Sequence, residues 1–386
     1  MIDRLRNLDR RFLGMIVFIF VVIIIIVIAM IILSLSSGGK KSYANIEKTM
    51  VSAAKKYYKD NPSMLPKEQG KDIEVDTTVL SSGGYMKDLS ELTKNDECKG
   101  KVIVGKNKKD YDYTAYLDCG SKYQTALLYA KLIENTVTSG EGLYAVSDFI
   151  EAPTTLGVDD DGYDLSKNEL LYGYVYRGQN VDNYIKIDKM LYRIVRIDGN
   201  NDFVVIQENN AKASYFDNRY NSETEKNSGM NNYYLSRIYD YSKEYYNTKI
   251  KDDNVLKKKA VSKNMCVGER SIDDTVNDGS IECSKVLKNT YIGLLSTYDV
   301  INASISTECT GTGDPNCGNY NYLVGSSMFW LATPNSEDSH SVFISNQNIS
   351  PVETNRSSGY KYVYYLSNKL IYESGSGTKT DPYIVK

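Results

Sequence analysis

The stretch MFWLATPNS, residues 328–336, contains the single tryptophan of a 386-residue chain that has 34 tyrosines. Its apolar run FWLA is followed at once by Thr-Pro-Asn, a pattern typical of a buried strand that ends in a turn. A buried indole contributes a large apolar surface and needs an acceptor for its N–H group. We therefore expect Trp330 to be a core residue on a central strand rather than part of a ligand-binding platform, and Pro334 to end that strand.

Short runs rich in Tyr, Ile and Val precede this strand. Between residues 172 and 209 they read YGYVYRG, NYIKI, MLYRIVRI and DFVVIQEN, and Asp-Lys and Asp-Gly-Asn turns separate them. Such runs predict an antiparallel β meander. One helix is expected to interrupt the β pattern over residues 231–247, with Asn231 or Asn232 as its N-cap. The residues at helical spacing that we expect to face the core are Tyr234, Ile238, Tyr241 and Tyr245.

The segment from Phe12 to Leu33 carries no charged residue and is long enough to cross roughly 30 Å of hydrocarbon. Arginines precede it, and positively charged flanks favour the cytoplasmic side. A cleaved secretory signal is the alternative, although its apolar region is usually shorter, roughly 7 to 15 residues. We therefore expect a cytoplasmic tail over residues 1–11, an uncleaved span in the lipid bilayer over residues 12–34, and the rest of the chain outside the cell.

The chain has six cysteines, all of which follow the apolar segment. None forms a CxxC pair and the chain has one histidine, whereas zinc sites usually need close cysteine pairs or histidines. Disulfides formed in an oxidising exterior fit this pattern better. We expect local pairing, although the sequence leaves crossed pairing among the last four cysteines open. The expected pairs are Cys98 with Cys119, Cys266 with Cys283, and Cys309 with Cys317.

The first disulfide should close a hairpin, because Cys98 and Cys119 lie equally far from the turn between KVIVG and YDYTAYL. Before this hairpin come an amphipathic helix that starts near Tyr43 and the motif GGYMKDL. Together with the apolar segment, these features resemble the N-terminal half of type IV pilin-like proteins over about residues 12–122. The resemblance implies a small α+β domain over residues 43–122. The processing motif of that family differs here, because MIVFI follows Gly14 and the glutamate of the mature pilin N-terminus is missing.

Residues 123–168 are expected to be a connector between two domains, in which a helical piece, YQTALLYAKLIEN, is followed by a run rich in Gly, Ser, Thr and Asp. Its acidic run offers a calcium site at Asp159, Asp161 and Asp164, but Glu169 falls one place late for the full calcium-loop pattern. A solvated turn is the favoured interpretation. We expect no metal and no cofactor.

The segment over residues 169–386 resembles the C-terminal domain of membrane-anchored surface proteins of low-GC Gram-positive bacteria. That domain is similar to the C-type-lectin and formylglycine-generating-enzyme type of fold. The stretches that carry the resemblance are YVYRGQNVDNYIKI, LYRIVRIDGNNDFVVIQEN, NYLVGSSMFWLATPNS and YVYYLSNKLIYESGSGTKTDPYIVK. Relatives of this kind often place tryptophan where this chain has Tyr192. The resemblance implies an α+β chain whose larger C-terminal domain is mostly β and lectin-like.

Catalysis has little support in the sequence. A Ser-His-Asp arrangement would need His340, but no nucleophile-elbow pattern surrounds the neighbouring serines. Formylglycine-generating enzymes work through cysteines, whereas Cys309 and Cys317 bound a short loop and are expected to form a disulfide. We expect no catalytic residues, and an enzyme of that type is the least favoured alternative. A net charge of −3 without a basic face also argues against nucleic-acid binding.

Binding is the favoured function, because loops rich in Tyr, Ser, Asn and Gly provide aromatic area and adaptable hydrogen bonds. An AT-rich genome would inflate Tyr and Asn without any role in binding, which is the competing explanation. We expect a recognition or adhesion protein for a glycan or protein of the cell envelope or a host surface. A pilin-like subunit of a filament or secretion machinery is the alternative. The expected binding residues are Asn335, Ser336, Asp338, His340, Asn346, Asn348 and Arg356.

Overall fold

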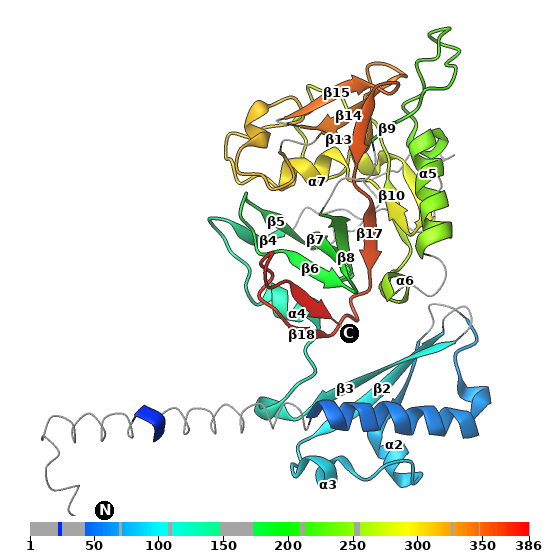
Figure 1. Cartoon of the computed structure of the whole chain (residues 1–386), viewed down its shortest axis with the longest axis vertical. Coiled ribbons are helices and arrows are strands. Elements are labelled where there is room, and N and C mark those ends of the chain that lie inside the picture. The colour runs from blue at the N-terminus through cyan, green and yellow to red at the C-terminus, as the bar shows by residue number, and fades with distance from the viewer. Residues whose placement is uncertain are drawn as a thin grey trace, which may run out of the picture. The chain divides into compact units, whose positions relative to one another are not determined.

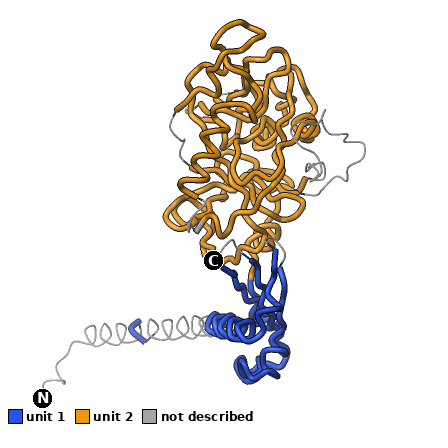
Figure 2. The backbone as a smooth tube through the Cα atoms, turned by 90° about the vertical axis from the view of Figure 1, so that its right-hand side faces the viewer, with its two compact units in different colours: residues 1–125 blue, residues 126–386 orange. Residues whose placement is uncertain are grey.

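The computed structural model describes most of the chain after residue 42. The described residues are 22–24, 43–68, 72–106, 110–146, 173–208, 213–250, 255–325, 328–346 and 348–385. Strands predominate over short helices, so the expected α+β class is confirmed at that level. The chain divides into two compact units, residues 1–125 and residues 126–386 (Figure 2).

Two expectations concern residues outside the described part of the chain. Apart from residues 22–24, the expected tail and span over residues 1–34 lie there, and so do Asp159, Asp161 and Asp164. Among the described residues, no helix has the length and apolar character needed to cross a membrane. The membrane span and the calcium site therefore stay predictions.

Unit 1 is a long helix packed on a three-stranded antiparallel sheet of order β1-β2-β3 (Figure 1). The helix covers residues 43–60, and it buries Met50 against Val102 and Leu117 of the sheet. Tyr58 rather than the neighbouring Tyr57 completes the buried stripe. The other elements are β1 (Ile73–Asp76), β2 (Lys99–Lys106), β3 (Tyr111–Asp118), η2 (Pro62–Met64), η3 (Gly120–Lys122), α2 (Thr77–Ser82) and α3 (Leu89–Thr93).

The hairpin of unit 1 agrees with its prediction. β2 and β3 pair in register from Lys99 opposite Asp118 to Lys106 opposite Tyr111. The residues that flank the first pair, Cys98 and Cys119, are joined by a disulfide. The predicted hairpin and its local bridge are therefore confirmed.

The larger sheet of unit 2 has nine strands in the order β12-β17-β8-β7-β6-β19-β18, with β4 and β5 attached through β7. Consecutive strands β6, β7 and β8 pair antiparallel, which confirms the predicted meander for these three. The strands are β4 (Gly142–Val146), β5 (Gly173–Arg177), β6 (Tyr184–Ile187), β7 (Met190–Ile197), β8 (Phe203–Gln207), β12 (Ile292–Gly293), β17 (Val363–Leu366), β18 (Tyr372–Ser374) and β19 (Tyr383–Val385).

The boundary of the second unit lies earlier than the sequence indicates. α4 (Leu128–Ile133) and β4 fall inside the expected connector over residues 123–168, yet β4 pairs with β5 over five residues. Leu128 and Leu143 are buried in the core of unit 2. The first part of the expected connector is therefore part of the second unit, which starts at residue 126 rather than 169.

The second sheet of unit 2 has five strands in the order β15-β14-β13-β16-β9, with β13 in the centre. Trp330 on β13 is fully buried, and its Nε1 donates a hydrogen bond to the carbonyl oxygen of Ser214 at 3.0 Å. Pro334 is the last residue of β13. Both predictions for this strand are confirmed. The five strands are β9 (Ser214–Tyr215), β13 (Phe329–Pro334), β14 (Ser341–Ser345), β15 (Ile349–Glu353) and β16 (Ser357–Tyr360).

The predicted helix over residues 231–247 is broken near its start. A short η5 (Tyr233–Leu235) is capped by Asn232, and α5 (Arg237–Tyr245) begins anew after Ser236, whose backbone is extended. The break changes which residues face inward. Tyr233, Ile238 and Ser242 are buried, whereas Tyr234 and Tyr241 are exposed, so the predicted buried stripe is wrong for these two tyrosines.

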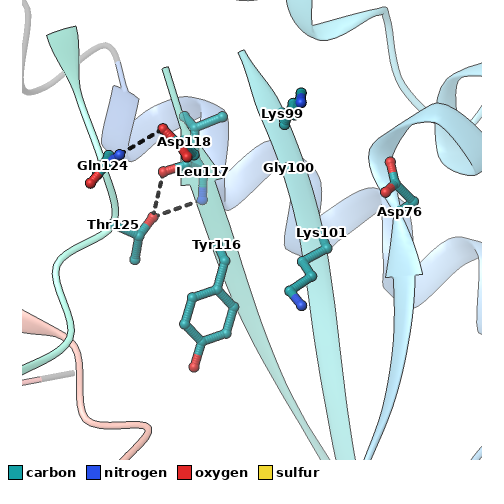
Figure 3. Close-up of a pocket in the computed structure, with 9 residues that line it drawn as sticks. All are labelled: Asp76, Lys99, Gly100, Lys101, Tyr116, Leu117, Asp118, Gln124 and Thr125. Carbon is teal, nitrogen blue, oxygen red and sulfur yellow. Dashed lines mark hydrogen bonds between the residues drawn. The ribbon is translucent and has the colours of Figure 1, made fainter. Parts of the chain in front are cut away.

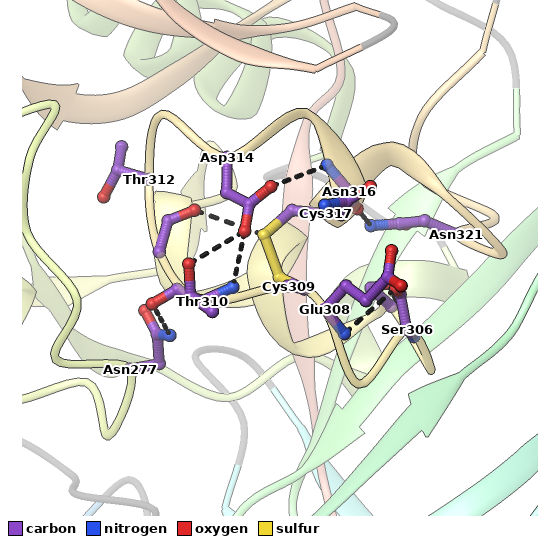
Figure 4. Close-up of a disulfide and its surroundings, with 12 residues drawn as sticks. Asn277, Ser306, Glu308, Cys309, Thr310, Thr312, Asp314, Asn316, Cys317 and Asn321 are labelled. Atoms are coloured by element: carbon purple, nitrogen blue, oxygen red, sulfur yellow. Dashed lines mark hydrogen bonds between the residues drawn. A yellow bond between two sulfur atoms is a disulfide. The ribbon is translucent and has the colours of Figure 1, made fainter.

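The last four cysteines also pair locally, Cys266 with Cys283 and Cys309 with Cys317, which excludes crossed pairing in this structure. β10 (Lys263–Cys266) leads to the first bridge and pairs with β11 (Val286–Thr290). Figure 4 shows the second bridge beside Asp314, whose carboxylate accepts hydrogen bonds from the backbone N–H groups of Thr310 and Asn316. These bonds hold the pKa of Asp314 below its ordinary value. The remaining elements are η6 (Tyr246–Ile250), η7 (Glu282–Ser284), η8 (Pro315–Gly318), α6 (Val255–Lys259) and α7 (Thr297–Asn302).

A buried arginine connects the two disulfide loops. Arg270 is fully buried, its Nη1 donates to the carboxylate of Glu282 at 2.9 Å, and its Nε donates to the hydroxyl of Thr312. Its backbone N–H bonds to the carbonyl of Pro334 at the end of β13. A buried guanidinium is stable only with such a set of partners, so Arg270 fixes both loops to the central strand.

Candidate functional site

The seven predicted binding residues lie in three turns of the five-stranded sheet. Because β14 is antiparallel to both β13 and β15, the β13–β14 and β15–β16 turns are at one end of the sheet and the β14–β15 turn is at the other. The structure therefore separates Asn346 and Asn348 from the rest. The residues at the first end are Asn335, Ser336, Asp338, His340 and Arg356.

Hydrogen bonds within the β13–β14 turn fix its conformation. The amide Nδ2 of Asn335 donates to Asp338 Oδ2 at 3.2 Å and to Ser341 Oγ at 3.0 Å. Ser341 Oγ donates to Asp338 Oδ2 at 2.6 Å, and the backbone N–H of His340 donates to Asp338 Oδ1 at 2.8 Å. Partial burial raises the pKa of Asp338, but these hydrogen bonds outweigh it and leave that pKa below the ordinary value. Asn335 is buried, so it supports the turn from within.

A loop that the sequence did not connect to this turn packs beside it. The loop covers residues 217–231, between β9 and η5, and α5 follows η5 (Figure 1). Asn231 Nδ2 donates to the carbonyl oxygens of Asn335 and Asp338, at 3.0 and 2.6 Å. Thr354, from the β15–β16 turn, donates its hydroxyl to the carbonyl of Ser228 at 2.7 Å. Two turns and one loop thus form a single hydrogen-bonded frame.

The loop over residues 217–231 is itself closed at its base by Asp217. One carboxylate oxygen of this buried residue accepts from Arg219 Nε at 2.8 Å and the other accepts from the backbone N–H of Met230 at 3.1 Å. Gly229 beside it has φ +75°, and a Cβ there would lie 2.3 Å from the carbonyl oxygen of Asp217. Asn221 Nδ2 donates to the Gly229 carbonyl at 2.8 Å. Only glycine fits this approach, so the loop conformation is strongly specified.

Large side chains are exposed on this frame and on η5, which follows the loop. Tyr220 is 61% exposed, and Met230, Tyr234 and Leu235 are also exposed. We use the name loop surface for the set Tyr220, Met230, Tyr234, Leu235, Ser336, His340 and Arg356. Arg356 pairs with Glu353 at 3.2 Å in solvent, an arrangement that contributes little to stability.

The first four members of the loop surface were missed at the sequence level. The segment YNSETEKNSGM has the Asn, Ser and Gly content of a structured turn, which is a usable local signal. Asn221 of this segment donates a hydrogen bond to Ser339, more than 100 residues later, and no local sequence pattern predicts such a contact. The helix prediction, moreover, placed Tyr234 in the core.

The β13–β14 turn does not assemble a nucleophile with a base. His340 Nδ1 lies 3.4 Å from Asp338 Oδ1, but the Ser341 hydroxyl donates to Asp338 rather than to His340. A serine nucleophile would need a hydrogen bond to the imidazole. Within the described part of the chain, no group of three or more His, Cys, Asp or Glu side chains is arranged to hold a metal ion.

Two hollows lie outside the loop surface. One in unit 1 has a volume of about 320 Å³ and is shown in Figure 3, where Gln124 bonds to Asp118 and Thr125 bonds to Leu117. One in unit 2 has a volume of about 380 Å³, and the carboxylate of its Glu141 accepts two backbone N–H groups. In both hollows polar groups are already engaged with one another, which leaves fewer of them for a ligand.

Comparison with known proteins was made by three routes. No protein-family model matches this chain, and searches among curated proteins and among solved structures find no match either.

Proposed function

We propose that this chain is a membrane-anchored, extracytoplasmic recognition protein. Residues 12–34 anchor it in the bilayer, a pilin-like unit 1 acts as a spacer, and a lectin-like unit 2 binds a glycan or protein of the cell envelope or of a host surface. The ligand contacts the loop surface. The protein is not an enzyme in this proposal.

The observation that carries the proposal is the combination of exposed aromatic and aliphatic side chains with a rigid polar frame. Tyr220 and Met230 belong to a loop whose base is fixed by Asp217 and whose flank is fixed by Asn231. A preorganised loop loses little conformational entropy on binding, so more of the contact energy becomes affinity. Tyrosine and arginine are also frequent among residues that dominate binding energy.

The extracellular location is supported by the disulfides. All six cysteines are paired, and disulfides persist in oxidising compartments. The packing of one helix on a three-stranded sheet in unit 1 agrees with the pilin resemblance at the level of architecture. A filament subunit is the second candidate. N-terminal sequencing of the mature protein separates the two, because an intact Met1 fits an anchor and a start at Met15 fits a processed pilin.

The loop surface is tested with the full chain in detergent micelles, using isolated cell-wall sacculi, a panel of host-surface glycans and intact host cells as binding partners. The double variant Tyr220→Ser/Met230→Ser removes two exposed side chains and leaves the frame in place. Loss of two such contacts should weaken binding by about 10- to 100-fold. Tyr320→Ser is the matched control, because Tyr320 is 60% exposed and lies outside the loop surface.

Two results would count against this proposal. If Tyr320→Ser weakened binding as much as the double variant does, the loss would not be specific to the loop surface. Conversion of a bound partner into a product, lost on His340→Ala, would place the chain among enzymes.

A further inference from the structure

A second feature of unit 2 lies on the nine-stranded sheet. Arg193 on β7 lies opposite Tyr184 on β6 and opposite Ile206 on β8, and Ile206 lies opposite Val363 on β17. Lys361 is two residues before Val363, and its Nζ lies 5.3 Å from the ring centroid of Phe329 on β13. Arg193 and Lys361 are thus two strands and two residues apart, a separation of roughly 12 Å between their Cα atoms.

Arg193 is buried without an anionic partner. It is 9% exposed, and its guanidinium lies between the rings of Tyr184 and Tyr322, at 4.5 and 4.3 Å from their centroids. Its Nε donates to the neutral amide oxygen of Asn183 at 2.9 Å. Among the described residues, no carboxylate lies within ion-pair distance of it.

Among the described residues, Lys361 also has no carboxylate within ion-pair distance. It is half-buried, and its one protein acceptor within the described chain is the backbone carbonyl of Glu208 at 3.5 Å. Burial lowers the pKa of its ammonium group, the charge of the Glu208 carboxylate offsets part of this effect, and the charge of Arg193 lowers the pKa further. The Glu208 carboxylate bonds instead to Lys379 at 2.7 Å on the rim. Glu208 thus pairs with Lys379 and acts on Lys361 from a longer distance, which leaves the charge of Arg193 in excess.

Such an excess is costly unless an anion balances it. A buried lysine can lose its proton, but an arginine stays charged, so Arg193 needs a counter-charge. Guanidinium and ammonium groups together form charge-assisted hydrogen bonds with oxyanions, and the planar guanidinium can bind two oxygens at once. Flanking tyrosine rings keep the guanidinium in place.

We propose that Arg193 and Lys361 form a binding site for an oxyanion, a carboxylate or a phosphate or sulfate group of a small ligand. Lys379 lies at the rim of this anion site and Tyr184 and Tyr322 hold the arginine. The site is separate from the loop surface, because Lys361 follows the last residue of β16 whereas the loop surface includes the turn before its first residue. The result of a test of this anion site therefore does not depend on whether the proposed recognition function is correct.

Thermal unfolding of the full chain in nonionic detergent tests the site. Inorganic phosphate, sulfate and acetate are titrated at constant ionic strength, with chloride as the replacement anion. Binding should raise Tm saturably, by about 5–10 °C at a hundred times Kd. A response to phosphate and sulfate alone assigns a phosphate-like group, whereas a response to acetate assigns a carboxylate.

Three variants decide whether the response comes from this site. Arg193→Gln should abolish the anion-dependent rise in Tm, and Lys361→Gln should reduce the affinity at least tenfold. Lys361 is half-buried, so its variant provides the test if Arg193→Gln fails to fold. Lys285→Gln is the control, because Lys285 is an exposed lysine paired with Glu269 elsewhere in unit 2, and it should respond as the wild type does. The proposal is overturned if no anion raises Tm above the chloride series, or if Lys361→Gln keeps the wild-type response.

Discussion

Replacement of Trp330 by alanine should destabilise unit 2 without acting directly on a binding surface. The side chain is fully buried on the central strand β13, and its ring meets Phe216 edge-on at 5.7 Å between centroids. Truncation of a buried tryptophan typically removes 3–5 kcal/mol from the free energy of unfolding, so we expect about 4 kcal/mol. The carbonyl of Ser214 also loses its donor, which adds about 1 kcal/mol if water does not replace it.

The assay is urea unfolding of the full chain followed by far-UV circular dichroism, since the variant has no tryptophan for fluorescence. Trp330→Phe is the matched variant, because it keeps most of the apolar volume and loses the N–H donor. It should cost about 1–2 kcal/mol. If Trp330→Ala kept the wild-type midpoint and lost attachment to a ligand, Trp330 would be a binding residue and not a core residue.

Three further predictions follow from the fold and the frame. A fragment of residues 126–386 should unfold in a cooperative thermal transition. A fragment of residues 169–386 should not, because it lacks α4 and β4, and an equal Tm for both fragments would contradict the observed boundary. The Tm of the wild type should fall as the pH drops below 3.8. The pKa of Asp338 is depressed in the folded protein, so its ionised carboxylate stabilises the fold above that pH and this stabilisation is lost when the carboxylate is protonated. Asp338→Asn should show a smaller fall in Tm. Gly229→Ala should cost about 1–3 kcal/mol and disorder the loop over residues 217–231, which amide hydrogen exchange would reveal as faster exchange there and unchanged exchange in unit 1.

The features that could be predicted from the sequence depend on short-range patterns. Cys98 and Cys119 are equidistant from a turn, so the register of one hairpin determined both the pairing and the disulfide. Trp330 lies in a short apolar run that ends at proline, and those neighbours alone indicate a buried strand. Strands β6 to β8 follow from alternation and turn residues in the same way.

The features that were missed depend on contacts between distant segments. The helix prediction failed at Tyr234 because Ser236 starts a new helix, and a break of one residue changes the helical phase. β4 was assigned to a connector because its five residues carry little β signal, and its pairing with β5 supplies the stability. Asn231 reaches the turn at Asn335 across 104 positions, and no local rule connects them. For the same reason Asn346 and Asp338 were grouped, although opposite ends of β14 separate them.

The most direct test of the account is the hydrogen-exchange footprint of the full chain when it binds the partner identified with sacculi, glycans or host cells. We expect slower exchange in residues 217–235 and 336–340, with no change around residues 346–348 or in unit 1. Slower exchange confined to unit 1, or to the turn at residues 346–348, would contradict the assignment of recognition to the loop surface.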